Sequence, residues 1–216
     1  MSALLSEQLR PFKNIVWDWN GTLLDDLHLN YQINADMMAE RGLNPHSVDD
    51  HRQHFNFPVS DFLQFLGFDL EAECYKELSA EHHVRYMDQV HQSCRLFHGT
   101  ESLLGQLKSE QKNMAILSLA EQSHLSDAVS SRNIQTYFDF IYGALNTDCH
   151  SKIERAGQLL EESGFNPEET VMVGDTLHDA EVAKATGMTA LLIGDGHQCP
   201  SRFTSAGAFV LNSRYS

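Results

Sequence analysis

Long hydrophobic runs are missing from this sequence of 216 residues. No stretch approaches the roughly 20 apolar residues that a transmembrane helix needs. The N-terminal stretch MSALLSEQLRPF also lacks the long apolar segment of a secretory signal peptide. We therefore expect a soluble protein of the cytoplasm, with no membrane partner.

Cysteine is scarce as well. The sequence has four cysteines, Cys74, Cys94, Cys149 and Cys199, and no two of them form a CxxC pair. Cysteines scattered in this way predict neither a disulfide framework nor a zinc site. Reduced thiols are the expected state.

Basic residues are few. The 15 Lys and Arg residues stand against 30 Asp and Glu residues, which gives a formal net charge of -15 with the 12 His counted as neutral. Such a charge repels nucleic acids and anionic membrane surfaces, so neither is an expected partner. An anionic substrate would have to be attracted by a metal ion or by a few local cations.

What the sequence does contain is a series of short apolar runs, at 14–19, 114–119, 139–144, 170–174, 189–193 and 207–211. Amphipathic stretches separate the later runs, at about 100–111, 121–133, 152–164 and 178–186. Continuous apolar strands that alternate with helices are typical of a parallel sheet covered on both faces. We predict an α/β fold with a Rossmann-like parallel sheet, formed by a core domain of residues 1–24 and 96–216.

Residues 25–95 follow a different pattern. They are helical in character at 27–42, 59–66 and 70–93, and they contain no convincing strand. We predict a small all-α cap domain inserted after the first strand. It would lie above the carboxyl ends of the strands, where ligands bind in such sheets. Hinges are expected near Asp25-Asp26 and Phe97-His98, so that closure of the cap excludes water from the site.

Polar residues follow the predicted strands at their carboxyl ends: Asp18, Ser118, Lys152, Asp175 and Asp179. Adjacent parallel strands bring such ends close together. Three neighbouring carboxylates repel one another unless a divalent cation and a lysine neutralise them. A serine hydroxyl, the lysine ammonium and backbone N–H groups around Gly21 would then suit the oxygens of a phosphate.

Four segments carry a specific resemblance: DWNGTLLDD, ILSLA, HSKIERAGQLL and VMVGDTLHDAEVAKATGM, in this order. Together they resemble the four motifs of the haloacid dehalogenase-like hydrolase superfamily, in the helical-cap branch to which phosphoglycolate phosphatase and phosphonatase belong. The resemblance implies that Asp18 is the nucleophile, which takes the phosphoryl group as an aspartyl-phosphate. It also implies that Ser118 and Lys152 hold the phosphate.

The same resemblance implies Mg²⁺ as the cofactor, bound by Asp18, Asp175 and the backbone carbonyl of Asn20. Asp179 would support the metal from the second coordination shell or through water. A divalent cation aligns a carboxylate nucleophile and offsets the charge of the transferring group, and Lys152 adds to this positive charge. Displacement of a halide from carbon needs no metal, so the acidic pair favours phosphoryl transfer over dehalogenation.

Asn20 departs from the pattern. Most phosphatases of this superfamily have an aspartate there, which protonates the leaving oxygen and then activates water, and an amide can do neither. Proton transfer of this kind is commonly worth about 10²–10⁴ in rate. The protein could hydrolyse phosphates with acidic leaving groups, or obtain a proton from His28, His51 or His54.

The expected function is that of a Mg²⁺-dependent phosphatase, a phosphoric monoester hydrolase acting on a small phosphorylated metabolite. Two alternatives stay open. One is a weakly active or inactive protein that binds a phosphometabolite or a partner. The other is a phosphotransfer or phosphonate-cleaving enzyme, for which the cap offers only one lysine, Lys76.

Two further features concern the substrate and the assembly. Arg52 resembles a position from which related caps send a basic side chain toward the active site, and it could bind a second anionic group of the substrate. Leu119 follows Ser118 where relatives often have asparagine, which loosens the expected phosphate contacts. The protein is expected to be a monomer or a homodimer.

Overall fold

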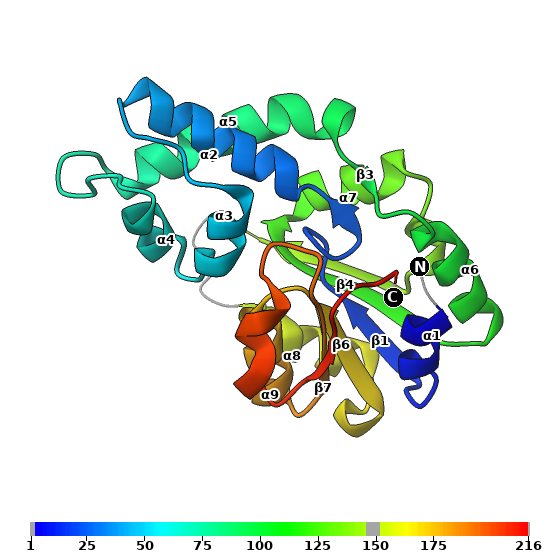
Figure 1. Ribbon diagram of the computed structural model, residues 1–216. Helices are drawn as coiled ribbons and strands as arrows, with labels where there is room; N and C mark the ends of the chain where they lie inside the picture. Colours follow the sequence, from blue (N-terminus) through cyan, green and yellow to red (C-terminus); the bar gives the residue numbers. More distant parts are fainter. Residues whose placement is uncertain (1–2, 146–151, 216) are drawn as a thin grey trace.

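A parallel sheet forms the centre of the protein (Figure 1). This computed structural model describes residues 3–145 and 152–215. Within them six strands pair side by side in the order β5-β4-β1-β6-β7-β8, and all of these pairings are parallel. The strands are β1 (Asn14–Trp17), β4 (Asn113–Glu121), β5 (Phe140–Ala144), β6 (Thr170–Gly174), β7 (Thr189–Ile193) and β8 (Phe209–Leu211).

Both faces of the sheet are buried, which explains the continuous apolar runs. Alternate residues of β1 belong to different hydrophobic clusters: Ile15 and Trp17 lie on one face, and Val16 lies on the other. A strand that packs on both sides has no polar face to show. The predicted α/β class with a Rossmann-like parallel sheet is confirmed.

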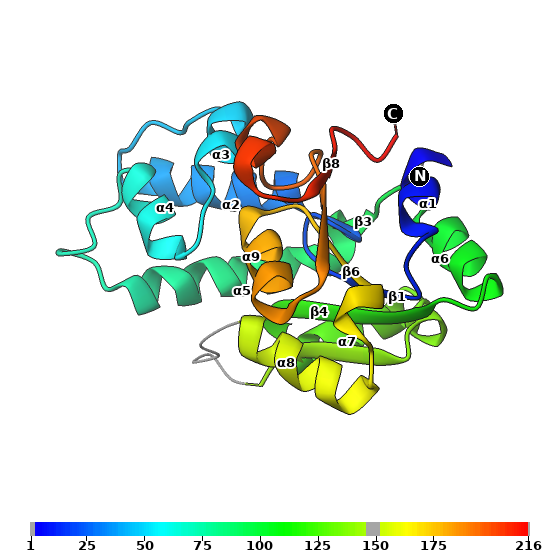
Figure 2. The same ribbon diagram turned by 90° about the horizontal axis from the view of Figure 1, so that it is seen from below.

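Helices cover the two faces of the sheet (Figure 2). Helices α6 (Thr100–Ser109) and α7 (Gln122–Ser131) contribute to the cluster of Ile15 and Trp17, whereas α8 (Lys152–Ser163) and α9 (Leu177–Thr186) contribute to that of Val16. A short N-terminal helix and three 3-10 turns complete this part: α1 (Ala3–Leu9), η1 (Gln135–Tyr137), η2 (Pro167–Glu169) and η3 (Pro200–Ser205).

Four helices lie together beyond the carboxyl ends of the central strands (Figure 1). They are α2 (Leu27–Glu40), α3 (Val48–His54), α4 (Val59–Phe65) and α5 (Tyr75–Ser93). Ion pairs help to join α2 to α5, among them Arg85 with Glu40 at 2.6 Å. These helices occupy the residues for which we predict a cap domain, and the exact division of the chain into two domains stays a prediction.

Three elements in and near this region were not expected from the sequence pattern. Strands β2 (Leu24–Asp25) and β3 (Arg95–Leu96) pair as a short antiparallel ribbon where the cap helices begin and end. Two residues are too few to produce a periodic pattern. Helix α3 has only 7 residues and starts at a capping box, in which Ser47 and Asp50 exchange hydrogen bonds of 3.0 and 3.1 Å.

Two expectations about the chain as a whole can be compared with the structure. None of the helices in the described ranges is long and apolar enough to cross a membrane. Cys74, Cys94 and Cys199 are free thiols, and Cys149 lies outside the described residues. His150 and Ser151 of the third motif lie outside them as well.

Candidate active site

Strand β1 delivers Asp18 to the carboxyl edge of the sheet. The backbone N–H of Asp18 donates to the carbonyl of Val173 at 2.8 Å, which extends the pairing of β1 with β6. The chain then turns back, and the carbonyl of Trp19 accepts from the N–H groups of Leu23 and Leu24 at 2.9 Å. Backbone hydrogen bonds on both sides therefore fix the position of Asp18.

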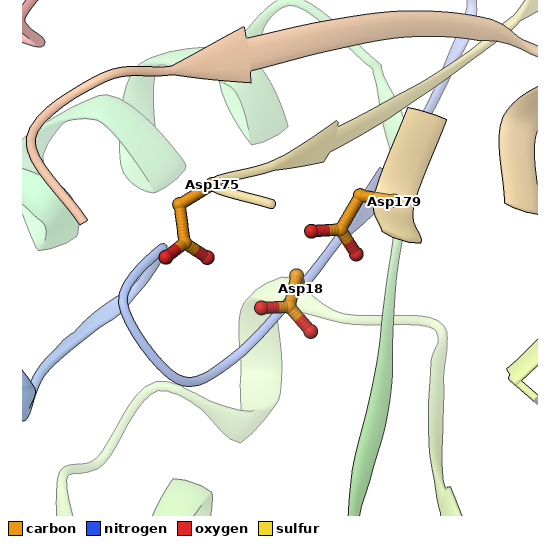
Figure 3. A group of neighbouring side chains, drawn as sticks. All are labelled: Asp18, Asp175 and Asp179. Carbon is orange, nitrogen blue, oxygen red and sulfur yellow. The ribbon is translucent and has the colours of Figure 1, made fainter. Parts of the chain in front are cut away.

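Three carboxylates converge at this edge, those of Asp18, Asp175 and Asp179 (Figure 3). Each has an oxygen within 4.8 Å of an oxygen of the others. Asp175 follows β6, and Asp179 lies in the first turn of α9. Their exposed fractions are 7, 0 and 1 %, so the cluster is buried.

Lys152 joins this cluster from the start of α8. Its Nζ donates to Asp18 Oδ1 and, at 2.7 Å, to Asp179 Oδ1. The lysine is 4 % exposed, so the ion pairs are shielded from water. Three negative charges and one positive charge leave a net charge of -2 in the cluster.

The charges of the cluster shift the pKa values of its members. Burial raises the pKa of Asp18 to about 8, with Asp179 and Asp175 adding to the effect and Lys152 opposing it. Burial also raises the pKa of Asp175. Although burial acts against it, the charges of Asp179 and Asp18 raise the pKa of Lys152, which therefore stays protonated. Burial first, and the neighbouring negative charges second, disfavour ionisation of these two aspartates.

Fixed hydrogen-bond donors hold the carboxylates of Asp175 and Asp179. Asp175 accepts from Thr22 Oγ1 at 2.9 Å and from the backbone N–H of His197 at 2.6 Å. Asp179 Oδ2 accepts from the N–H and the hydroxyl of Thr176 at 3.1 and 2.7 Å. Asp179 thus acts as a helix-capping residue and still points its other oxygen into the cluster.

Two glycines make room for these carboxylates. A Cβ on Gly174 would lie 2.2 Å from Asp179 Cγ, and a Cβ on Gly21 would lie 2.2 Å from Asp175 Oδ2. Gly21 also has a φ of +70°, which other residues rarely adopt. Both positions therefore require glycine for the cluster to form.

The residues of the cluster fit Mg²⁺. Carboxylate oxygens are the ligands that this cation prefers. A divalent cation would also cancel the net charge of -2 that remains after Lys152 is counted.

Ser118 lies at the same edge of the sheet. It belongs to β4, the neighbour of β1, and comes two residues after Ile116, which pairs with Trp17. The side chain is buried, and its Oγ accepts from the N–H of Ala120 at 3.1 Å, which leaves the hydroxyl hydrogen for another acceptor. Leu119, the unexpected residue of this motif, is 37 % exposed.

Asn20 turns toward the cap. Its Nδ2 donates to Asp26 Oδ2 at 2.6 Å and to the hydroxyl of Tyr86, on α5, at 2.8 Å. The role of the three histidines that were candidates for a proton donor stays a prediction. His28 and His54 are exposed, and burial lowers the pKa of His51 to about 3, so that His51 is neutral.

Arg52 does not join the carboxylates. From α3 its guanidinium donates to the carbonyls of Gly196 at 3.0 Å and Gly194 at 2.5 Å, and more weakly to that of Gln198 at 3.4 Å. These carbonyls belong to the loop after β7. Arg52 therefore fastens the cap to the core in this structure, and a role in substrate binding stays a prediction.

Sequence reasoning overlooked three residues near the site. Asp26 lies within the first motif, but nothing in the motif suggests that its carboxylate is buried. His197 follows β7, where a polar residue after a strand was a usable signal. Its Nε2 lies 3.0 Å from Asp26 Oδ1, and against the effect of burial Asp26 raises the pKa of His197 to about 9. Arg214, in the C-terminal segment, carried no signal at all.

The chain is similar to known phosphatases. It is 24 % identical to a phosphoglycolate phosphatase of Synechococcus elongatus over 186 residues, which cover 83 % of this chain and 82 % of the relative. It is also 24 % identical to a 5'-nucleotidase of Pseudomonas aeruginosa over 188 residues, which cover 86 % of this chain and 84 % of the relative.

The fold matches a haloacid dehalogenase-like hydrolase of Streptococcus pneumoniae. The TM-score is 0.76 at 23 % identity, over 93 % of this chain and 94 % of the other. A family model, described as haloacid dehalogenase-like hydrolase, matches residues 15–193. That range covers most of the chain and includes the whole acidic cluster with Lys152 and Ser118. The chain therefore belongs to the haloacid dehalogenase-like hydrolase family.

Proposed function

We propose that this protein is a Mg²⁺-dependent phosphatase, which hydrolyses a small phosphorylated metabolite through a phosphorylated Asp18. One observation carries the proposal: a buried lysine pairs with the carboxylate that ends β1, and two further carboxylates lie beside them. Such a group combines a nucleophile, a cation for the phosphate and ligands for a divalent metal.

The chemistry of the chain's own residues follows from this arrangement. An oxygen of Asp18 attacks phosphorus, the new O–P bond forms, and the ester oxygen departs with its electron pair. Water then attacks the aspartyl-phosphate, so that inorganic phosphate leaves and the Asp18 carboxylate is restored. Lys152 and the Ser118 hydroxyl would bind the phosphoryl oxygens during both steps.

The metal would be held by the carboxylates of Asp18 and Asp175 and by the backbone carbonyl of Asn20. When bound, Mg²⁺ supplies positive charge that favours ionised Asp18 and offsets the charge on the transferring phosphoryl group. Asp179 would keep Lys152 in position and support the metal from outside its first shell. Thr22 and the backbone of His197 would orient Asp175.

Asn20 determines which substrates suit the site. Its amide has no proton to give to a departing alkoxide, so substrates whose leaving group is already acidic, such as aryl or acyl phosphates, should react best. Hydrolysis of the aspartyl-phosphate should also be slow, because no carboxylate at position 20 activates the water.

Substrate access requires the cap to move. Asp18 is only 7 % exposed beneath the cap. The ribbon of β2 and β3 joins the two crossings between core and cap, and we propose that the hinges lie there. Opening would admit substrate, and closure would exclude water.

The phosphonate-cleaving alternative draws no support from Lys76. This lysine is exposed near the start of α5. It precedes Tyr86, the residue of α5 that contacts Asn20, by roughly 15 Å of helix. A Schiff base at the cluster would need a lysine much closer to Asp18.

The test is hydrolysis of para-nitrophenyl phosphate with Mg²⁺ and with EDTA. We expect turnover that requires Mg²⁺ and is lost in Asp18→Asn. Asp127→Asn removes an exposed carboxylate of α7 and serves as the matched control with unchanged activity. A folded wild-type protein that turns over no phosphate ester, yet is stabilised by phosphate compounds, would instead be the binding protein.

A further inference from the structure

A fourth buried carboxylate, that of Asp26, lies close to the cluster but has no part in the proposed chemistry. Its side chain is fully buried, and it stands just before α2, where the chain enters the cap. On the core side, Oδ1 accepts from the N–H of Gly21 at 2.9 Å and lies 3.0 Å from His197 Nε2. These contacts tie Asp26 to the loop that follows Asp18.

The other oxygen of Asp26 is bound mainly from the cap. Oδ2 accepts from Tyr86 Oη on α5 at 2.9 Å and from Asn30 Nδ2 on α2 at 2.9 Å. The third donor to the same oxygen is Asn20 Nδ2, at 2.6 Å, and it comes from the core. Asp26 is thus a buried hub: its carboxylate accepts hydrogen bonds from the core and from the cap helices.

Asn20, Tyr86 and Asp26 form a closed triangle. The amide nitrogen of Asn20 has two hydrogens, and it donates one to Asp26 Oδ2 and the other to Tyr86 Oη. The Tyr86 hydroxyl in turn donates to Asp26 Oδ2. An aspartate at position 20 has no hydrogen for either bond when ionised, and it would face a second buried carboxylate at hydrogen-bond distance.

We propose that Asn20 and Asp26 are a matched pair, in which the amide at position 20 latches the core loop to Tyr86 of the cap through the carboxylate at position 26. An amide suits position 20 because it can donate to the neighbouring carboxylate, which would repel an ionised acid there. Asn20 is then a positioning residue, and the single substitution Asn20→Asp cannot restore proton transfer without opening the latch. This last consequence rests on the proposed function, whereas the latch itself does not.

Exchange of the two side-chain types should preserve the latch. In Asn20→Asp/Asp26→Asn the amide at position 26 donates to the carboxylate at position 20, and Tyr86 keeps an acceptor. The Oδ1 atom at position 26 still accepts from the N–H of Gly21. Asn30 can turn its amide to accept instead of donating.

The experiment compares Asn20→Asp, Asp26→Asn, the double variant and Tyr86→Phe, without substrate and in EDTA. Thermal unfolding and amide hydrogen exchange are measured for each, with attention to peptides from 19–30 and 80–90. Asn44→Asp, an exposed position in the cap, adds the same charge without contacting Asp26 and is the control.

We expect Asn20→Asp to lower the melting temperature by about 4–8 °C. Exchange in both peptides should become about tenfold faster, since the cap opens more often. Tyr86→Phe should behave in the same direction, and Asn44→Asp should change neither quantity. The double variant should recover a large part of the loss but not all of it, because position 26 no longer carries the charge that faces His197.

The rate of alkyl phosphate hydrolysis distinguishes a positioning role of Asn20 from a purely stabilising one. Given a working phosphatase, the double variant should hydrolyse an alkyl phosphate at least about tenfold faster than either single variant, because it has both the latch and a carboxylate at position 20. Independent, additive effects of the two substitutions on melting and exchange would overturn the latch. Because those readouts need no turnover, a protein without phosphatase activity would still decide the matter.

Discussion

Asp18 shares its buried space with more negative charge than Lys152 can balance. Burial, together with the charges of Asp179 and Asp175, raises the pKa of Asp18 to about 8. The folded protein then holds a proton on Asp18 more tightly than the unfolded chain does. From this group, stability is therefore greatest at low pH and is lost as the pH rises toward about 8.

The consequence is a pH-dependent effect of Mg²⁺. The cation binds the ionised carboxylates and competes with the proton, so its stabilising effect should grow between about pH 6 and pH 8. We expect the increase in melting temperature at a fixed Mg²⁺ concentration to be larger at pH 8 than at pH 6. Asp175→Asn should abolish the increase at every pH. An increase that is the same at both pH values would contradict this account of the cluster.

Gly174 offers a test of how tightly the cluster is built. In Gly174→Ala the new Cβ would lie 2.2 Å from Asp179 Cγ, so Asp179 must move and Lys152 must lose one of its two partners. We expect the rate of phosphate ester hydrolysis to fall by at least about 100-fold. Gly157→Ala is the matched control, since nothing lies within 4 Å of that position on α8. It should raise the free energy of unfolding by about 0.5–1 kcal/mol.

The loop after β1 is held by an element that is distant in the sequence. Arg214, in the C-terminal segment, is fully buried and donates to the carbonyl of Gly21 at 2.8 Å and to that of Thr22. It also pairs with Asp195 at 2.7 Å and lies over the ring of Phe97. The guanidinium therefore clamps the part of the loop that the proposed metal site uses.

Removal of this clamp should damage both stability and the site. Arg214→Met removes the ion pair with Asp195 and the guanidinium donor to the carbonyls of Gly21 and Thr22, which costs about 3–5 kcal/mol of unfolding free energy. We also expect weaker Mg²⁺ binding, measured by titration calorimetry at a temperature where the variant is folded. Arg10→Met, at an exposed position, is the control of equal charge. Unchanged Mg²⁺ affinity in folded Arg214→Met would contradict the clamp.

Elements were predictable where local pattern and tertiary packing agree. The bounds of β6 and β7 match the predicted runs 170–174 and 189–193, because both strands are buried on two faces. The ribbon of β2 and β3 was missed because its stability comes from pairing between distant segments. The helical class of the cap was predictable, but its contacts with the core were not.

The residues of the site were predictable by the same criterion. Asp18, Lys152, Asp175 and Asp179 follow strands or begin helices, and the parallel sheet brings such positions together without further information. The roles of Asp26 and Arg214 depend on long-range contacts that no local pattern records. Arg52 is an intermediate case, since its charge is visible in the sequence and its partners, backbone carbonyls of a distant loop, are not.

The whole molecule is held shut over the cluster by contacts between cap and core. Besides the hub at Asp26, helix α3 is fastened to the loop after β7 by Arg52 and by Gln198 Nε2, which donates to the Phe55 carbonyl at 2.8 Å. Access to Asp18 therefore depends on breaking two groups of polar contacts. The formal charge of -15 repels a phosphate, so positive charge close to Asp18 must attract it.

Arg52→Ala should weaken the contact between cap and core, and its effect on hydrolysis should be the same for different substrates. Since its guanidinium binds backbone carbonyls, we expect kcat/KM to change by the same factor for para-nitrophenyl phosphate and for a phosphate ester that carries a second carboxylate. Asp49→Ala, on the same helix and exposed, is the control. A loss confined to the substrate with the second anionic group would support the direct substrate contact predicted from the sequence.

The most direct test is chemical detection of phosphorylated Asp18. The protein is mixed with para-nitrophenyl phosphate and Mg²⁺, quenched, treated with borohydride, which reduces an aspartyl-phosphate to homoserine, and digested for mass spectrometry. We predict homoserine at position 18 in the wild type and none in Asp18→Asn, with an accumulation that reflects the missing carboxylate at position 20. Continued hydrolysis with an unmodified Asp18 would contradict the proposed mechanism.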